Sequence, residues 1–274
     1  MNLSKRVLCL FTVPLITVAC SASVVVDIPV SKDNVLVEDN NGSLSNGSGQ
    51  FLYVGNTAQN DSVNSRRTLL RFDLLGAGIP TDSTIIDVNL MLRLAGSASS
   101  IERTIHLYPL FQNWGEGTSS SLGAKGAAAS IGDATWLHTF FPNALWHSAG
   151  GDFSETPSAS VVVPAITGLY NWSTDDMVAD VQDWLDTPSE NFGWLVFGDE
   201  SSYRTAMVFH SRENNTSPPL LSVTYVPEPF VLSMLCFGGG LLVSRRQGDI
   251  VHTHQGVSSG ETCFPEAFPF GDTL

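Results

Sequence analysis

Alternation of apolar and polar residues between Ile86 and Leu94 constrains the fold more than any other feature of the sequence. Every second residue in this stretch is Ile, Val or Leu, and the residues between them are mostly polar. A period of two is the period of a β-strand, in which one face packs on a core and the other meets solvent. The stretch is therefore predicted to be a half-buried strand of an antiparallel sheet.

Shorter apolar and β-branched runs punctuate the rest of the chain. They span residues 24–29, 51–54, 68–74, 104–110, 160–163, 193–197, 204–210 and 220–225. Clusters of Asn, Asp, Gly, Ser and Pro separate them, as at residues 39–42 and 217–219, and such clusters mark turns. No βαβ rhythm is present. The pattern predicts an all-β fold, a jelly-roll β-sandwich of two antiparallel sheets.

One short helix is predicted after residue 172. Ser173 and Asp176 have the spacing of a capping box, in which the Ser173 hydroxyl caps the first turn. Apolar residues then recur at helical spacing as far as Leu185, and Pro188 ends the run. Trp184 lies on this apolar stripe and is predicted to be a core residue.

Residues 115–158 form a long loop rich in Gly, Ala and Ser with little periodicity. A loop of this length in a compact domain is usually functional or disordered, and its aromatic residues argue against disorder. Trp114, Trp136 and Trp146 lie in or beside this loop rather than in alternating strands. They are the candidates for exposed aromatic platforms, and the alternative is that they anchor the loop.

The first 22 residues have the order of a secretory signal peptide. Lys5 and Arg6 precede an apolar run over residues 7–19, which ends in small residues. Residues 17–20 also form a weak lipobox, and lipidation of Cys20 is the alternative to simple cleavage. The protein is therefore predicted to be exported to the cell surface or the extracellular space, with outer-membrane association as one form of attachment.

The sequence after residue 226 has three elements in order: Pro227-Glu228-Pro229, an apolar run over residues 230–243, and Arg245-Arg246. Such a run rises about 21 Å as a helix, less than the roughly 30 Å hydrocarbon core, so its membrane insertion would be transient. The order resembles the PEP-CTERM sorting signal, which implies cutting near Pro-Glu-Pro by an exosortase-type enzyme. A tail of unassigned role, residues 247–274, follows. A buried C-terminal helix is the alternative.

The positions of the cysteines and the net charge exclude several kinds of site and partner. All four cysteines lie outside residues 24–225, so the body has no disulfide framework, thiolate metal site or Cys nucleophile. With 13 basic and 27 acidic residues the net charge is −14, and no Lys/Arg stripe is present to bind phosphates. Nucleic acid is therefore not expected as a partner.

Several motifs occur in one order along residues 27–225. They are Arg66-Arg67-Thr68-Leu69-Leu70-Arg71-Phe72-Asp73-Leu74, Ile79-Pro80, Trp114-Gly115-Glu116-Gly117-Thr118, Gly132-Asp133-Ala134-Thr135-Trp136, Asp180-Val181-Gln182-Asp183-Trp184-Leu185, Asn191-Phe192-Gly193-Trp194 and Ser211-Arg212-Glu213-Asn214. The ordered set resembles the DNRLRE domain, a jelly-roll family that overlaps carbohydrate-binding module family 96. The resemblance implies a single β-sandwich over residues 24–225 that binds polysaccharide or extracellular matrix.

Sugar binding needs flat aromatic faces and a few polar groups that fix hydroxyls. Besides the three tryptophans, His138, Arg66 and Arg71 are candidate ligand-binding residues. Arg71 stands between Leu70 and Phe72, so its alternative role is to meet an acidic partner on the outer face of a strand. Convergence of several arginines on one face would favour an anionic polymer.

Oxygen-bearing side chains near the start of the domain suggest a structural Ca²⁺ site. Asp33, Asp39 and Asn41 offer hard ligands, and a jelly roll could bring Asp199 and Glu200 close to them. Such an ion would stabilise the folded state of a sandwich that lacks disulfides. No spacing matches an EF-hand, and the alternative is an acidic loop that is simply solvated.

Motifs of common enzyme classes are absent from the sequence, which has no Gly-x-Ser-x-Gly elbow, His-Glu-x-x-His pair or phosphate-binding loop. Asp133, Asp152, Glu116 and Glu155 are the carboxylates from which a glycosidase-like pair would come. The chain is predicted to be no enzyme but an exported surface module that binds polysaccharide. A structural or adhesive surface protein is the first alternative, and a polysaccharide lyase or glycoside hydrolase is the second.

Overall fold

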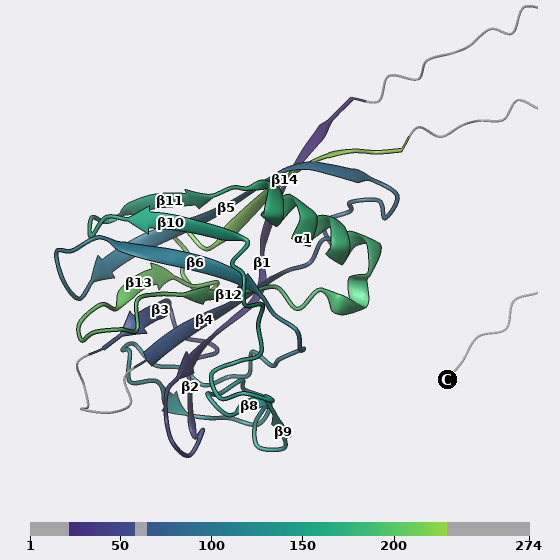
Figure 1. The fold of residues 1–274 in the computed structure, drawn as a ribbon. Coiled ribbons are helices and arrows are strands. Elements are labelled where there is room, and N and C mark those ends of the chain that lie inside the picture. The colour runs from purple at the N-terminus through teal and green to yellow at the C-terminus, as the bar shows by residue number, and fades with distance from the viewer. Residues whose placement is uncertain (1–21, 58–64, 229–274) are drawn as a thin grey trace, which may run out of the picture. The chain divides into compact units, whose positions relative to one another are not determined.

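The computed structural model describes residues 22–57 and 65–228, which form two antiparallel sheets packed face to face (Figure 1). Sheet A contains, in spatial order, β1 (Val24–Val37), β14 (Leu220–Val226), β5 (Thr84–Ser97), β13 (Met207–His210) and β3 (Phe51–Asn56), with β11 (Gly168–Trp172) also paired to β5. Sheet B contains β1, β4 (Ser65–Phe72), β12 (Trp194–Phe197), β6 (Arg103–Pro109) and β10 (Ala159–Val163). The end of β3 also pairs with β4, which joins the two sheets at that edge. The predicted all-β sandwich is confirmed.

Strand β1 belongs to both sheets. Its first part pairs with β14 in sheet A, and from Val30 onward it pairs with β4 in sheet B, with a register shift between Val30 and Lys32. The strand predicted over residues 24–29 was therefore too short. Its continuation was missed because Asp33 and Asn34 look like loop residues, although both side chains are buried.

The inner core lies between the two sheets and follows the alternation of β5. Val88, Leu90, Leu92 and Leu94 point into it and are fully buried. Ile86 does not: it is exposed and Ile85 is buried instead. The reason is a register shift in the pairing of β5 with β14, between Thr224 and Tyr225, which reverses the alternation at this end.

Helix α1 (Asp175–Asp186) packs against β5 and contributes Met177, Val181, Trp184 and Leu185 to the inner core. The prediction that Trp184 is a core residue is confirmed. The N-cap is Thr174 rather than Ser173, since the Thr174 hydroxyl accepts a hydrogen bond from the Met177 N–H. A short 3₁₀ helix, η1 (Pro188–Glu190), follows and leads into β12.

The Gly-rich part of the chain, residues 111–158, forms a layer on the outer face of sheet B, called here the loop layer (Figure 1). It contains the short strands β7 (Ala127–Ala128), β8 (His138–Phe140) and β9 (Ala144–Leu145), of which β7 pairs with β2 (Leu44–Ser45). A second apolar cluster, the outer core, joins this layer to the sheet; its buried members are Leu36, Leu69, Leu110, Trp114, Ala134, Trp146 and Leu195.

The two ends of the sandwich chain lie side by side, because Val24 pairs with Tyr225. Strand β14 ends at Val226, immediately before Pro227 and the exposed Glu228. Pro229, Arg245 and Arg246, the predicted apolar span, the tail and residues 1–21 of the predicted signal peptide lie outside the described residues. Within residues 22–57 and 65–228, no helix combines the length and hydrophobicity that spanning a bilayer requires.

Candidate functional site

Two of the three predicted aromatic platforms are buried. Trp114 is 0 % exposed and Trp146 is 5 % exposed, and both belong to the outer core. Their indole N–H groups donate to backbone carbonyls, Trp114 to Phe192 O at 2.9 Å and Trp146 to Thr135 O at 3.0 Å. The prediction of exposed platforms is wrong for these two residues, because the loop layer needs its large side chains to bury against sheet B.

Trp136 is partly exposed, but a cation of the protein itself covers one face of its ring. The guanidinium carbon of Arg67 lies 4.6 Å from the ring centroid, and the same group lies 4.9 Å from the Phe197 ring. Arg67 also donates to both carboxylate oxygens of Glu200, each at 2.8 Å, and to Gly150 O at 2.8 Å. Arg67 therefore fixes the loop layer to β12 and the segment after it.

Neither Arg66 nor His138 presents a free group to solvent. Arg66 is buried and donates to the carbonyls of Ala124 and Ser65. Burial lowers its pKa to about 10. The His138 ring is hydrogen-bonded to the Thr135 hydroxyl at 2.9 Å and is almost fully buried. Both were predicted as ligand-binding residues, and both instead hold the fold together.

Arg71 lies on β4 opposite Lys32 of β1, so its cross-strand neighbour is a second cation. Among the described residues no ion pair involves Arg71, and its Nε is buried without a hydrogen-bond acceptor. The acidic partner predicted for this residue is therefore not found there.

An open groove crosses the part of sheet B that the loop layer leaves uncovered. It has a volume of about 620 Å³ and is called here the β6 groove; it is lined by Glu102, Arg103, Thr104, His106, Phe197, Gly198, Asp199, Glu200 and Ser201. His106 Nδ1 lies 2.7 Å from the Ser160 hydroxyl, and its ring stands 5.9 Å from that of Tyr108. Burial lowers the pKa of His106.

The charges of the β6 groove are largely paired. Arg103 lies 3.2 Å from Asp199, and Glu200 holds Arg67. Hydrogen bonds from Ser201 lower the pKa of Asp199, so this carboxylate stays ionised. The arginines do not converge on one face as free cations. This groove was missed in the sequence because none of its residues belongs to a recognisable motif.

The predicted calcium ligands are not brought together as a set. Asp39 accepts hydrogen bonds from the Ser43 N–H and hydroxyl at 2.8 and 2.7 Å, which organises its own turn. Asn41 is exposed. Asp199 and Glu200 form ion pairs with Arg103 and Arg67 at the β6 groove. Asp33 belongs to a different cluster.

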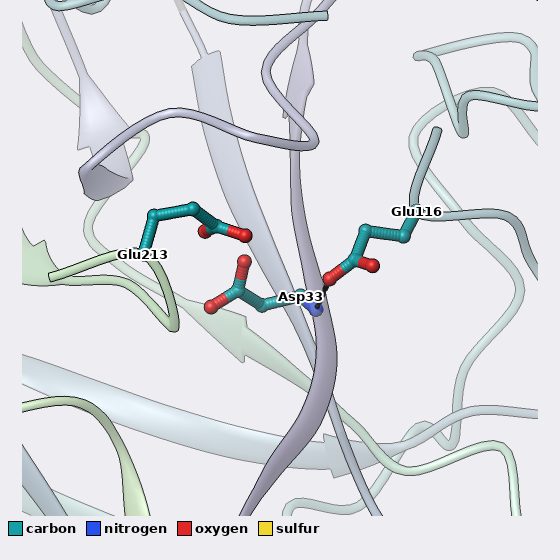
Figure 2. Close-up of side chains that lie close together, drawn as sticks. All are labelled: Asp33, Glu116 and Glu213. Atoms are coloured by element: carbon teal, nitrogen blue, oxygen red, sulfur yellow. Dashed lines mark hydrogen bonds between the residues drawn. The ribbon is translucent and has the colours of Figure 1, made fainter. Parts of the chain in front are cut away.

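That cluster joins Asp33 of β1, Glu116 of the loop layer and Glu213 of the turn after β13 (Figure 2). One carboxylate oxygen from each residue lies within 4.8 Å of one from each of the others. Figure 2 shows the Asp33 carboxylate directed toward Glu213, with Glu116 approaching from the other side. Of the three, only Asp33 was predicted as a metal ligand from the sequence; Glu116 was considered for catalysis alone.

Arg212 organises the carboxylate cluster. Its backbone N–H donates to Asp33 Oδ2 at 2.7 Å, and its guanidinium donates to Glu116 Oε1 and bonds to Glu213 Oε1, both at 2.9 Å. The Asp33 N–H also donates to Glu116 Oε1, at 3.0 Å. Two buried oxygens, Asp33 Oδ1 and Glu213 Oε2, have no hydrogen-bond donor. Burial raises the pKa of Asp33 well above its usual value.

Lys32 lies next to this cluster but is bound elsewhere. Its ammonium group donates to Asn113 Oδ1 at 3.1 Å and to Trp114 O, and it lies over the Trp114 ring. Burial, together with the nearby charge of Arg71, lowers its pKa to about 8. Lys32 thus anchors the start of the loop layer to β1.

Two other acidic residues considered for catalysis, Asp133 and Asp152, organise loops, and the third, Glu155, is exposed. Asp133 is fully buried and accepts hydrogen bonds from the N–H groups of Ser130 and Ser119. Asp152 accepts from the N–H groups of His147 and Ser148 at 2.7 and 2.9 Å. These bonds give both carboxylates a structural role in the loop layer.

Comparison with known proteins adds no family to this description. No protein-family model matches the chain, and no curated protein matches it either.

Proposed function

We propose that the protein is an exported, non-catalytic module that binds polysaccharide in the β6 groove. The observation that carries the proposal is the groove itself, where the aromatic rings of Phe197 and His106 stand beside polar side chains on sheet B. Its volume of about 620 Å³ falls within the range of ligand pockets. Aromatic faces pack against sugar C–H groups, and the polar groups fix the hydroxyls.

The charge of the groove favours a neutral polymer. Its lining has three acidic residues, Glu102, Asp199 and Glu200. Arg103 pairs with Asp199 and Arg67 with Glu200, so one acidic residue remains in excess. A uronate or sulfated chain would be repelled by this excess of negative charge and by the net charge of −14. We therefore expect neutral polysaccharides to bind and alginate not to bind.

Delivery to the cell surface forms the second part of the proposal, and it rests on the sequence at the two ends of the chain. The sandwich supports it in one respect: β14 ends at Val226, just before the Pro-Glu-Pro motif. Cutting by an exosortase-type enzyme at that motif would leave all strands of the sandwich intact. Glu228 is exposed, as a processing site requires.

Affinity electrophoresis of the full chain tests the binding. Migration through gels containing galactomannan, mixed-linkage β-glucan or alginate is compared with migration through plain gels. We expect a neutral polymer to retard the protein, and His106→Ala to weaken that binding about tenfold, or about 1.4 kcal/mol. His210→Ala is the matched control, because His210 is also a half-buried strand histidine but lies in sheet A.

Three outcomes would count against this function. If no polysaccharide retards the chain, the structural or adhesive role replaces it. If His106→Ala and His210→Ala behave alike, the sugar binds outside the β6 groove. If reducing ends or unsaturated products appear when the chain is incubated with the polymer that it binds, the protein is a hydrolase or lyase.

A further inference from the structure

We propose that Asp33, Glu116 and Glu213 bind one Ca²⁺ ion, which fastens the loop layer to both sheets of the sandwich. The three residues come from β1, from the loop layer and from the turn that follows β13. An ion held by all three would therefore connect segments that are far apart in the sequence. The site differs from the calcium ligands predicted from sequence in every residue except Asp33.

The separations fit a single ion of this kind. Calcium–oxygen distances are about 2.3–2.6 Å, so two ligands of one ion stand up to about 5 Å apart. One carboxylate oxygen from each of the three residues lies within 4.8 Å of the other two. Carboxylates bind Ca²⁺ through one or both oxygens, and water completes the coordination.

The strongest indication of a ligand is the state of Asp33. Its side chain is 1 % exposed, and Oδ1 has no hydrogen-bond donor. The carboxylate is directed toward Glu213 (Figure 2). A buried carboxylate oxygen without a partner is costly, because the lost hydration is not replaced. Glu213 Oε2 is in the same condition. A divalent cation between these oxygens supplies the interaction that both lack.

Charge balance points the same way. When all three carboxylates are ionised, as ligands of a cation are, they and the guanidinium of Arg212 leave two negative charges in the cluster. Lys32 is directed to the carbonyl of Trp114 and the side chain of Asn113 rather than to these oxygens. One Ca²⁺ ion neutralises the two remaining charges.

The backbone around Glu116 is fixed as a binding site requires. A Cβ on Gly47 would lie 1.7 Å from Glu116 O, and one on Gly117 would lie 1.5 Å from Asp133 Oδ1. Asn34 Nδ2 donates to Glu116 O at 2.8 Å from its buried position on β1. The glycines thus allow the segment to pack closely against the turn after β2 and against Asp133, while the bond from Asn34 ties it to β1 beside Asp33.

Equilibrium dialysis of the chelator-treated full chain against ⁴⁵Ca²⁺ tests the proposal. We expect one bound ion per chain, with Kd in the 10⁻⁴–10⁻³ M range or tighter, as in extracellular modules. Calcium at one hundred times Kd should raise Tm by about 5–10 °C for a domain of this size. Mg²⁺ should raise it much less, since Mg²⁺ demands shorter, octahedral coordination.

Two conservative variants locate the ion. Asp33→Asn removes the charge but keeps an acceptor for the Arg212 backbone N–H. Glu213→Gln removes the charge but keeps an acceptor for the Arg212 guanidinium. Both should weaken Ca²⁺ binding at least tenfold. Glu190→Gln is the control, because Glu190 is exposed on η1 and lies outside the cluster.

In chelator, Asp33→Asn should melt at or above the temperature of the wild type, since it removes a buried charge. That result would exclude misfolding as the cause of lost binding. The proposal is overturned if the wild-type chain binds no calcium at about 5 mM, well above the range for such sites. Equal binding by the wild type and both variants, or an equal effect of Mg²⁺, would also overturn it.

Discussion

Trp172 in the inner core and Trp114 in the outer core are both fully buried, and each donates its indole N–H to a backbone carbonyl. The chain brings them to these positions in different ways. Trp172 ends a strand paired with β5 and packs between the two sheets, whereas Trp114 sits in a loop layer that covers sheet B from outside. Strands of both sheets line the inner core. In the outer core, strands of sheet B line one side and the loop layer lines the other.

The other side of the outer core depends on turns, glycines and buried polar groups. Asp133 and Thr135 are buried there and hold the loop layer through hydrogen bonds to nearby backbone groups. The proposed calcium site lies where this layer meets the sandwich, whereas the β6 groove lies on the part of sheet B that the layer leaves uncovered. The irregular layer and the regular sheet thus each carry one of the two proposed sites.

The largest expected effects come from truncating the two tryptophans. Trp172→Ala and Trp114→Ala should each lower the free energy of unfolding by about 3–5 kcal/mol, because each leaves a large cavity in a packed region. Urea denaturation followed by circular dichroism measures both. If Trp114→Ala cost less than about 1 kcal/mol, the outer core would not be part of the cooperative fold.

A smaller effect is expected from the backbone of the loop layer. A Cβ on Gly115 would lie 1.7 Å from Gly132 O, so Gly115→Ala forces two backbone segments apart. We expect a loss of roughly 2–3 kcal/mol in the free energy of unfolding. Gly123→Ala is the control, since an added Cβ there meets no atom within 4 Å; it should change stability by less than about 1 kcal/mol. Equal effects of the two changes would contradict the tight packing of the layer.

The smallest effect concerns Asp180, which joins α1 to the inner core. Burial raises its pKa, although hydrogen bonds from Ser158 and Trp194 oppose the rise. Between its unfolded and folded pKa the folded state binds more protons, so its contribution to stability falls as pH rises. Asp180→Asn keeps an acceptor for the Trp194 indole N–H and removes the pH-dependent contribution of this carboxyl group to stability.

The free energy of unfolding of Asp180→Asn minus that of the wild type should therefore increase as pH rises from the unfolded-state pKa of Asp180 to its folded-state pKa. Urea melts of both proteins at a series of pH values measure the difference. A difference that is constant, or that shrinks as pH rises, would contradict the assignment of a raised pKa to this residue.

The inner core could be predicted from the sequence because its signal is local. A strand with one buried face alternates regardless of what it pairs with, so β5 and the helical stripe of α1 were recognisable from residue spacing alone. The exception at Ile86 shows the limit, since the register shift that exposes it depends on β14.

The outer core and the carboxylate cluster could not be predicted in the same way. A tryptophan in a Gly-rich segment has the same sequence context whether it is exposed or anchors the loop, so Trp114 and Trp146 were misassigned. Asp33, Glu116 and Glu213 meet only after three distant segments fold together. A weak signal existed in the Gly-flanked Glu116 and in the adjacent Arg212 and Glu213, but neither indicated the other.

Hydrogen exchange in the loop layer tests most directly whether this irregular layer is a fixed part of the fold, on which the proposed calcium site depends. The amides of Gly115, Trp146 and Gly150 donate to carbonyls within the layer at 2.9, 3.1 and 2.7 Å. We expect them to be protected to the same order as the amides of β4 and β12. Exchange of these three at the rate of an unstructured chain, while the sheets remain protected, would contradict the account.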